Sequence, residues 1–281
     1  MKRIQNIALI LSSVVIVFLS SCEDMVTEID VPSVDAKYVI ESYLSPEDSM
    51  VIVKVGKTDP LFSVVDDDHV WMSQITVDVN GQQLTREGNT NVFSISSSVL
   101  SLQPGSEYTV TLNYPDSISL SGKCTIPAVK NTSLVFEGID SSASTWDQGY
   151  YDYYARYSFQ DIPGTEDYYR IGMKVTWYDE WDMDTIEYEE FPNMEYFISD
   201  IERDGEEISG RFFFHYGESM EEVIHISLYL YTTDKMYYDY HRAVLNENAE
   251  NPFSEPVIIP TNVENGLGCV AGVRRYEIVV Y

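Results

Sequence analysis

The sequence has 281 residues, with 17 basic against 46 acidic side chains and a formal net charge of −29 at pH 7. An acidic balance of this size argues against binding to nucleic acid and against electrostatic attraction to anionic lipid headgroups. The length and the 44% of hydrophobic residues allow one large or two ordinary domains with a real core.

The first 22 residues have the organisation of an export signal. Lys2 and Arg3 give a positive start, and residues 7–19 form an apolar run. As a helix this run rises about 20 Å, well short of the roughly 30 Å hydrocarbon core of a bilayer. It ends on Leu19-Ser20-Ser21-Cys22, which resembles the lipobox of bacterial lipoproteins. We therefore expect Cys22 to be acylated, for example with palmitate, and to become the new N-terminus. The alternative is a plain secretory signal that happens to contain Cys22 at its cleavage site.

The next residues favour a tethered protein at a membrane surface. Residues 23–36 are polar, acidic and interrupted by Pro32, which is typical of a tether. Glu23 and Asp24 resemble a short signal that sends many lipoproteins of the phylum Bacteroidota to the cell surface. We expect a lipid-anchored outer-membrane protein exposed at the cell surface, with the periplasmic face as the alternative. The membrane contact would come from the acyl chains.

Residues 37–128 are predicted to form an immunoglobulin-like β-sandwich. Short β-branched and aromatic runs at residues 38–44 and 50–55 are separated by the turn-forming Ser45-Pro46-Glu47-Asp48. The alternating run of residues 74–79 then meets Asn80-Gly81, a strong hairpin signal. Three further strands are predicted at residues 91–95, 108–114 and 117–126.

A second motif supports the sandwich. The segment Leu102-Gln103-Pro104-Gly105-Ser106-Glu107-Tyr108 resembles the tyrosine corner of immunoglobulin-like domains. In that corner the tyrosine hydroxyl bonds back to an upstream backbone group and fixes the crossing between the two sheets.

After a linker around residues 128–131, residues 131–281 are predicted to form a second β-rich domain with one helix. The helix is placed at about residues 233–246, because Thr233 or Asp234 can cap it. Its apolar stripe is expected to contain Met236, Tyr240 and Val244. The acidic residues 179–190 are expected in an exposed loop or hairpin tip. The predicted strands include residues 167–175, 210–214, 223–231 and 276–281, and a glycine-rich segment with Gly266, Gly268 and Gly272 precedes the last of them.

Tyrosines offer one candidate binding surface. A tyrosine ring presents a large area and a hydroxyl group at a small entropic cost, so tyrosine-rich faces are favoured in binding surfaces. Along residues 223–231, Ile224, Ile226, Leu228 and Leu230 are expected on one face and His225, Ser227, Tyr229 and Tyr231 on the other. For Tyr151, Tyr153 and Tyr157, the alternative is that they fill one face of a half-buried strand. The candidate ligand or partner residues are Tyr151, Tyr153, Tyr157, Tyr229 and Tyr231.

Metal sites have weaker support. Asp66-Asp67-Asp68-His69 is better interpreted as a solvated loop, because adjacent residues point in different directions. Glu180-x-Asp182-x-Asp184 has the spacing that begins a calcium loop, but Thr185 replaces the glycine of the sharp turn. Asp182 and Asp184 therefore remain weak calcium candidates, and no other cofactor is expected. The four histidines share no metal-ligand spacing.

Catalytic motifs are missing from the sequence. There is no G-x-S-x-G elbow and no locally supported Cys/His pair, so the protein is predicted not to be an enzyme. Cys124 and Cys269 are far apart in sequence and could either pair in an oxidising compartment or remain as buried thiols.

Four segments together resemble one protein family. They are residues 38–55, the Leu102-x-Pro104-Gly105-x-x-Tyr108 corner, the element from Asp161-x-Pro163-Gly164 to Tyr168-Tyr169-Arg170, and the ending from the 233–246 helix to Gly272. The chain is similar, over almost all of its mature length, to the Bacteroidota lipoproteins grouped as domain-of-unknown-function family 4249. The resemblance implies an outer-membrane lipoprotein, often found alongside TonB-dependent transporters, with no established enzymatic activity. Cys269 departs from the aromatic or aliphatic residue expected there.

The functional hypothesis combines these points. We expect a non-enzymatic accessory or binding subunit that works with a TonB-dependent transporter in nutrient uptake, with an unidentified small-molecule ligand. Two alternatives are a carbohydrate-active hydrolase that uses a carboxylate pair and a structural envelope lipoprotein.

Overall fold

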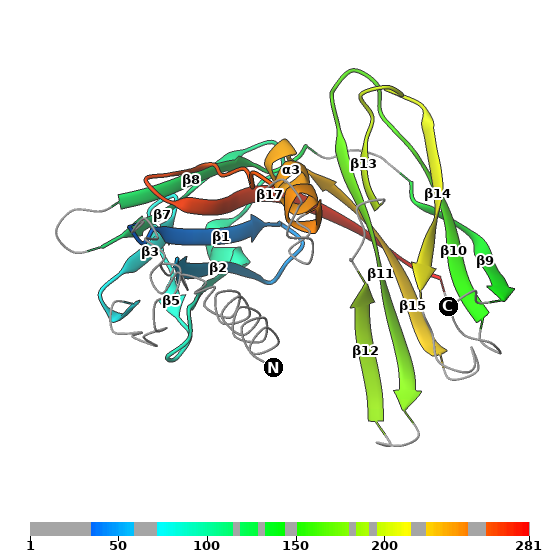
Figure 1. The fold of residues 1–281 in the computed structure, drawn as a ribbon, viewed down its shortest axis with the longest axis horizontal. Coiled ribbons are helices and arrows are strands. Elements are labelled where there is room, and N and C mark those ends of the chain that lie inside the picture. The colour runs from blue at the N-terminus through cyan, green and yellow to red at the C-terminus, as the bar shows by residue number, and fades with distance from the viewer. Residues whose placement is uncertain are drawn as a thin grey trace, which may run out of the picture. The chain divides into compact units, whose positions relative to one another are not determined.

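The fold is built on one long sheet whose strands come from both ends of the chain (Figure 1). The computed structural model describes residues 35–58, 72–114, 119–128, 133–143, 151–179, 184–190, 196–214, 223–246 and 257–280, without the side chains of residues 177, 179, 184, 186–190 and 214. The protein is mainly β, as the sequence predicts. Within the described ranges, no helix is long and apolar enough to cross a membrane.

The long sheet has nine strands, and β13 joins it only through β11. Most neighbours are antiparallel, but β1 and β17 run parallel to each other. Along the path of the sheet the strands are β12 (Asp184–Glu190), β11 (Tyr168–Asp179), β15 (Val223–Thr233), β17 (Leu267–Val279), β1 (Tyr38–Leu44), β2 (Met50–Lys57), β6 (Val92–Ser96) and β5 (Thr85–Arg86), with β13 (Phe197–Ser199) beside β11.

Two smaller sheets cover one face of this sheet, which we call the core face. The first packs on the N-terminal strands around aliphatic residues such as Val53, Val110 and Leu120. The second packs on β11 and β15 around aromatic residues such as Phe159, Tyr169 and Phe212. The first contains β16 (Val263–Glu264), β8 (Ser119–Thr125), β7 (Glu107–Asn113), β3 (Thr76–Val79) and β4 (Gln82–Gln83), and the second contains β14 (Glu207–Phe214), β10 (Tyr151–Gln160) and β9 (Val135–Ala143).

Local sequence signals explain the N-terminal sandwich. Asn80 and Gly81 adopt positive φ values of 48° and 80° between β3 and β4, which is the geometry of the predicted tight hairpin. The tyrosine corner is present, because the Gln103 backbone N–H donates to the Tyr108 hydroxyl at 2.7 Å. A short helix, α2 (Ser97–Leu100), follows β6.

Strand β17 joins the two halves of the chain. Its first residues pair with β1, from Val39 opposite Leu267 to Leu44 opposite Gly272, and its last residues pair with β15. β16 pairs with β8. The expected division into residues 37–128 and 131–281 therefore needs a correction, because residues 263–272 complete the N-terminal sandwich. This segment is glycine-rich because Gly268 has φ +116° and a Cβ there would lie 1.9 Å from the Ile40 carbonyl oxygen.

The opposite face of the long sheet, which we call the helix face, carries the helix α3 (Lys235–Asn246). Alternation along β17 places Val270 toward the core face and Cys269, Ala271 and Val273 in a cluster with α3. Figure 1 shows α3 crossing over β17. The helix lies within the predicted range of residues 233–246. Its start is fixed by Asp234, whose Oδ1 accepts the Tyr237 backbone N–H at 2.9 Å.

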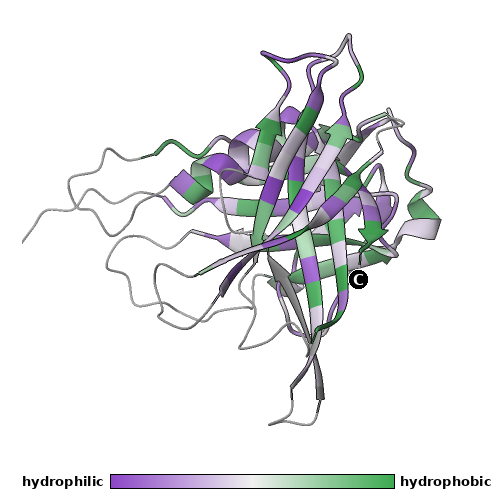
Figure 2. Ribbon diagram, turned by 90° about the vertical axis from the view of Figure 1, so that its right-hand side faces the viewer, coloured by the Kyte–Doolittle hydropathy of each residue, from purple (hydrophilic) through white to green (hydrophobic). Residues whose placement is uncertain are grey.

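Two periodicity predictions need correction. Ile226, Leu228 and Leu230 do face the core, but a register shift opposite Thr176 and Trp177 leaves Ile224 exposed. On α3, Tyr237 and Tyr238 are buried, whereas Val244 of the predicted stripe is exposed. The alternation of hydrophobic and hydrophilic residues along the strands is visible in Figure 2.

Candidate functional site

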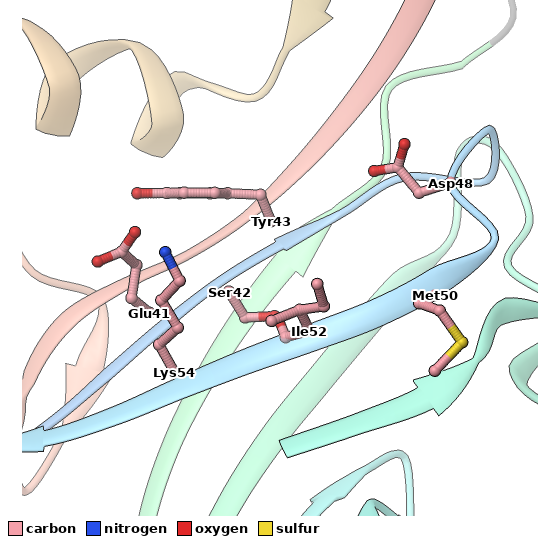
Figure 3. Close-up of a pocket in the computed structure, with 7 residues that line it drawn as sticks. All are labelled: Glu41, Ser42, Tyr43, Asp48, Met50, Ile52 and Lys54. Atoms are coloured by element: carbon pink, nitrogen blue, oxygen red, sulfur yellow. The ribbon is translucent and has the colours of Figure 1, made fainter. Parts of the chain in front are cut away.

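The helix face has a pocket of about 230 Å³ on the neighbouring strands β1 and β2. The two strands alternate, so that Val51, Val53 and Val55 enter the core while the residues between them face outward. Met50 and Ile52 are 41% and 43% exposed and form an apolar floor. The lining residues, shown in Figure 3, are Glu41, Ser42, Tyr43, Asp48, Met50, Ile52 and Lys54.

Charged groups lie at both ends of this helix-face pocket. Glu41 and Lys54 are direct cross-strand partners at one end, and Asp48 lies at the other (Figure 3). Burial raises the pKa of Asp48, although Arg275 acts in the opposite sense with its Nη2 atom 3.5 Å from Asp48 Oδ1. An apolar floor between polar ends suits a small amphipathic group or a side chain of a partner protein.

The five candidate tyrosines do not form one surface. Tyr157 and Tyr229 are only 3% and 2% exposed, so the prediction that they belong to an accessible surface is wrong. Tyr153 and Tyr157 belong to the core between β10 and the long sheet, which agrees with the alternative of a half-buried strand. Tyr151 is exposed at the start of β10. Tyr231 packs in the cluster beneath α3, on the other face of the long sheet.

Three buried carboxylates form an acidic cluster that the sequence patterns did not predict. Asp161 follows β10, Asp167 precedes β11 and Asp200 follows β13. One carboxylate oxygen from each lies within 4.8 Å of the other two, and all three residues are buried. The family-like element from Asp161 to Tyr169 already contained two of the three, but Asp200 is brought in only by the pairing of β13 with β11.

Hydrogen bonds hold the acidic cluster in place. The Tyr169 hydroxyl donates to Asp161, and the backbone N–H of Gly205 donates to Asp161 Oδ2 at 2.7 Å. The backbone N–H of Asp167 donates to Asp200 Oδ1 at 2.8 Å. Burial and the Asp161 carboxylate both raise the pKa of Tyr169, which keeps its proton available for donation. Carboxylate oxygens are ligands that Ca²⁺ accepts, so this is the group of described residues that could hold a metal.

The remaining site predictions have different outcomes. Cys22 and Asp182 lie outside the described residues, and Asp184 is described only by its backbone, opposite Asp179. Cys124 and Cys269 are both free and buried, and burial raises the pKa of each thiol. Sequence patterns do not identify the pocket residues Glu41, Ile52 and Lys54, although the alternation of residues 50–55 predicts that Ile52 and Lys54 face outward.

Comparisons with known proteins place the chain in a family. The family model of a domain of unknown function, DUF4249, matches residues 26–278. No curated protein matches the chain. Among solved structures, it is similar to the crystal structure of a DUF3823 family protein from Parabacteroides merdae ATCC 43184, with 7% identity, a TM-score of 0.19, and coverage of 70% of this chain and 90% of that chain. That TM-score is too low to support any argument. Because the family model covers nearly the whole chain, the protein belongs to the DUF4249 family.

Proposed function

We propose that this protein is a lipid-anchored outer-membrane lipoprotein that serves as a non-enzymatic binding or accessory subunit beside a TonB-dependent transporter in nutrient uptake. The observation that carries the proposal is the apolar run ending on Leu19-Ser20-Ser21-Cys22 ahead of an acidic β-sheet body. Acylation of Cys22 would hold that body at the membrane, while its negative charge would keep it away from anionic headgroups.

The helix-face pocket supports the binding part of the proposal. Exposed apolar side chains on a regular strand face are a feature of interaction sites, and Met50 and Ile52 lie next to each other there. Rigid strands β1 and β2 fix their positions, and the charged residues at both ends provide orientation. The pocket therefore has the composition of a small recognition site on a stable scaffold.

The test is a tagged pull-down from mildly solubilised outer membrane, with the recovered proteins identified by mass spectrometry. We expect one TonB-dependent transporter in near-equal amount. Cys22→Ala should remove the protein from the membrane fraction. Ile52→Glu should lose the transporter, whereas Ile258→Glu, a control at a residue that is 90% exposed in a different segment, should keep it.

Recovery of the protein alone would contradict the proposal. In that case glycan binding and hydrolysis assays would separate an independent binder from the carbohydrate-active hydrolase.

A further inference from the structure

His241 lies in an aromatic cluster between α3 and the long sheet. Its ring centroid is 4.2 Å from that of Tyr237, 5.1 Å from that of Tyr43 on β1, and 6.0 Å from that of Phe197 on β13. The His241 Nε2 atom is buried and has no hydrogen-bond partner within the described part of the chain. The same holds for the Tyr43 hydroxyl. The cluster therefore accommodates an imidazole ring but offers its Nε2 no acceptor.

A fixed positive charge shares this cluster. The Arg170 guanidinium carbon lies 4.9 Å from the Phe197 ring centroid and 5.7 Å from the Tyr237 centroid, and the guanidinium donates to the Tyr237 hydroxyl. Burial raises the pKa values of Tyr43 and Tyr237, and the Glu41 carboxylate of β1 acts on both in the same direction. From β17, the group facing the cluster is the neutral thiol of Cys269.

These surroundings disfavour the imidazolium form. A protonated imidazole carries two N–H donors and a positive charge, and here it would meet a buried environment and the Arg170 guanidinium. Burial, followed by Arg170, lowers the pKa of His241 to about 4. In an undocked helix the pKa would return to about 6.5. The docking contribution of neutral His241 is therefore fully present above pH 6.5 and is lost as the pH falls toward 4.

The other end of α3 has the opposite dependence. Asp234 Oδ2 accepts the Gly272 backbone N–H at 2.7 Å, and Oδ1 caps the helix. Burial raises the pKa of Asp234 to about 6 against the lowering effect of these hydrogen bonds. A carboxyl group with a raised pKa contributes most to docking below its unfolded pKa of about 3.9 and loses that contribution as the pH rises through 6. Acid therefore strengthens the start of α3.

We propose that acid releases only the C-terminal half of α3, which carries His241, while the Asp234 cap keeps the N-terminal half on the sheet. Tyr43 contacts His241 and also lines the helix-face pocket, so the release would reshape that pocket. This consequence rests on the proposed function. The release itself is tested on the protein alone.

The test is hydrogen exchange of the full chain at pH 7 and pH 4.5, corrected for the intrinsic rate at each pH. From the two pKa values, protection of the amides of residues 241–246 should fall on the order of 50-fold at pH 4.5, while residues near Asp234 and Tyr237 stay protected. His241→Phe keeps a ring in place and should abolish the fall. His225→Phe, at the half-buried histidine of β15, should retain it.

Unchanged protection of residues 241–246 in the wild type would overturn the proposal. So would an equal fall in His241→Phe, or simultaneous loss at both ends of α3. An NMR titration provides a second measurement that needs no variant to fold. A His241 pKa well below 6.5 supports the proposal, and a value at or above 6.5 contradicts it.

Discussion

The two faces of the nine-stranded sheet are covered in different ways, although the same strands supply both. On the core face, two further sheets bury residues of the long sheet, with an aliphatic core in the N-terminal half and an aromatic core in the C-terminal half. On the helix face, α3 covers the middle around β17 and leaves Met50 and Ile52 exposed. The core face therefore holds most of the buried packing, whereas the helix face leaves apolar side chains exposed.

The largest expected effect comes from the strand that joins the two halves. Gly268→Ala would place a Cβ 1.9 Å from the Ile40 carbonyl oxygen at a φ of +116°, so β1 and β17 could not keep their pairing. We expect a loss of about 3 kcal/mol or more in the free energy of unfolding, measured by urea denaturation.

Gly164 is the matched control for Gly268. It also has a positive φ, of +105°, but within the described part of the chain no atom beyond its own neighbours in sequence lies within 4 Å of the place that a Cβ would occupy. Gly164→Ala should cost only about 1–2 kcal/mol, from backbone strain alone. If Gly268→Ala and Gly164→Ala lower the free energy of unfolding by the same amount, the close packing of β17 against β1 does not contribute to stability.

A smaller effect is expected in the aromatic core. Tyr169→Phe removes the hydroxyl that donates to Asp161 and leaves a buried carboxylate with one fewer donor. The free energy of unfolding should fall by about 2 kcal/mol, as judged from the denaturation midpoint. Tyr108→Phe in the N-terminal sandwich removes a hydroxyl that accepts the Gln103 N–H, and should cost about 1 kcal/mol. A larger loss in the free energy of unfolding for Tyr108→Phe than for Tyr169→Phe would mean that the acidic cluster does not depend on Tyr169.

The turn between β1 and β2 should contribute less again. Glu47 Oε1 lies 2.5 Å from Arg274 Nε, and Glu47 Oε2 accepts the Arg275 backbone N–H at 3.3 Å. Glu47→Gln should cost about 1 kcal/mol and weaken the salt dependence of thermal unfolding. Asp239→Asn breaks an exposed pair with Lys235 on α3 and should change stability by less than about 0.5 kcal/mol. An unchanged free energy of unfolding in Glu47→Gln would show that this turn does not stabilise β17.

The smallest stability effect is expected on the helix face. Ile52→Glu replaces an exposed side chain, so the free energy of unfolding should change by no more than about 0.5 kcal/mol. Val53→Glu, one residue along and fully buried in the core, should prevent stable folding. If calorimetry shows that Ile52→Glu loses as much stability as Val53→Glu, the two faces of the sheet do not differ in their contribution to stability.

Local signals in the sequence were enough for much of the fold. Asn80-Gly81 specified a hairpin, the segment before Tyr108 specified a tyrosine corner, and Asp234 marked the start of α3. The pairing of β17 with β1 could not be predicted, because more than 200 residues separate the partners and nothing in either strand identifies the other. Gly266, Gly268 and Gly272 indicate that another backbone approaches closely, but they do not identify the strand that does so.

The candidate site was harder to predict for physical reasons. Tyrosine is amphipathic, so its presence on a strand does not decide between a surface and a core, and Tyr157 and Tyr229 are both buried. The exposure of Ile224 follows from a register shift opposite β11, which no single-strand periodicity reveals. Asp161, Asp167 and Asp200 meet only because the end of β10, the start of β11 and the end of β13 lie near one another.

We propose that the helix-face pocket, and not the core side of the sheet, contacts a partner. Oxidation of Met50 by hydroxyl radicals tests it most directly, compared between the purified protein and outer membranes that contain it. Met50 is exposed on the helix face, and Tyr276 is exposed on the other side of the same sheet. We expect Met50 to be protected several-fold in the membrane and Tyr276 to be oxidised equally in both samples. Equal oxidation of Met50 in both samples, or equal protection of Tyr276, would contradict it.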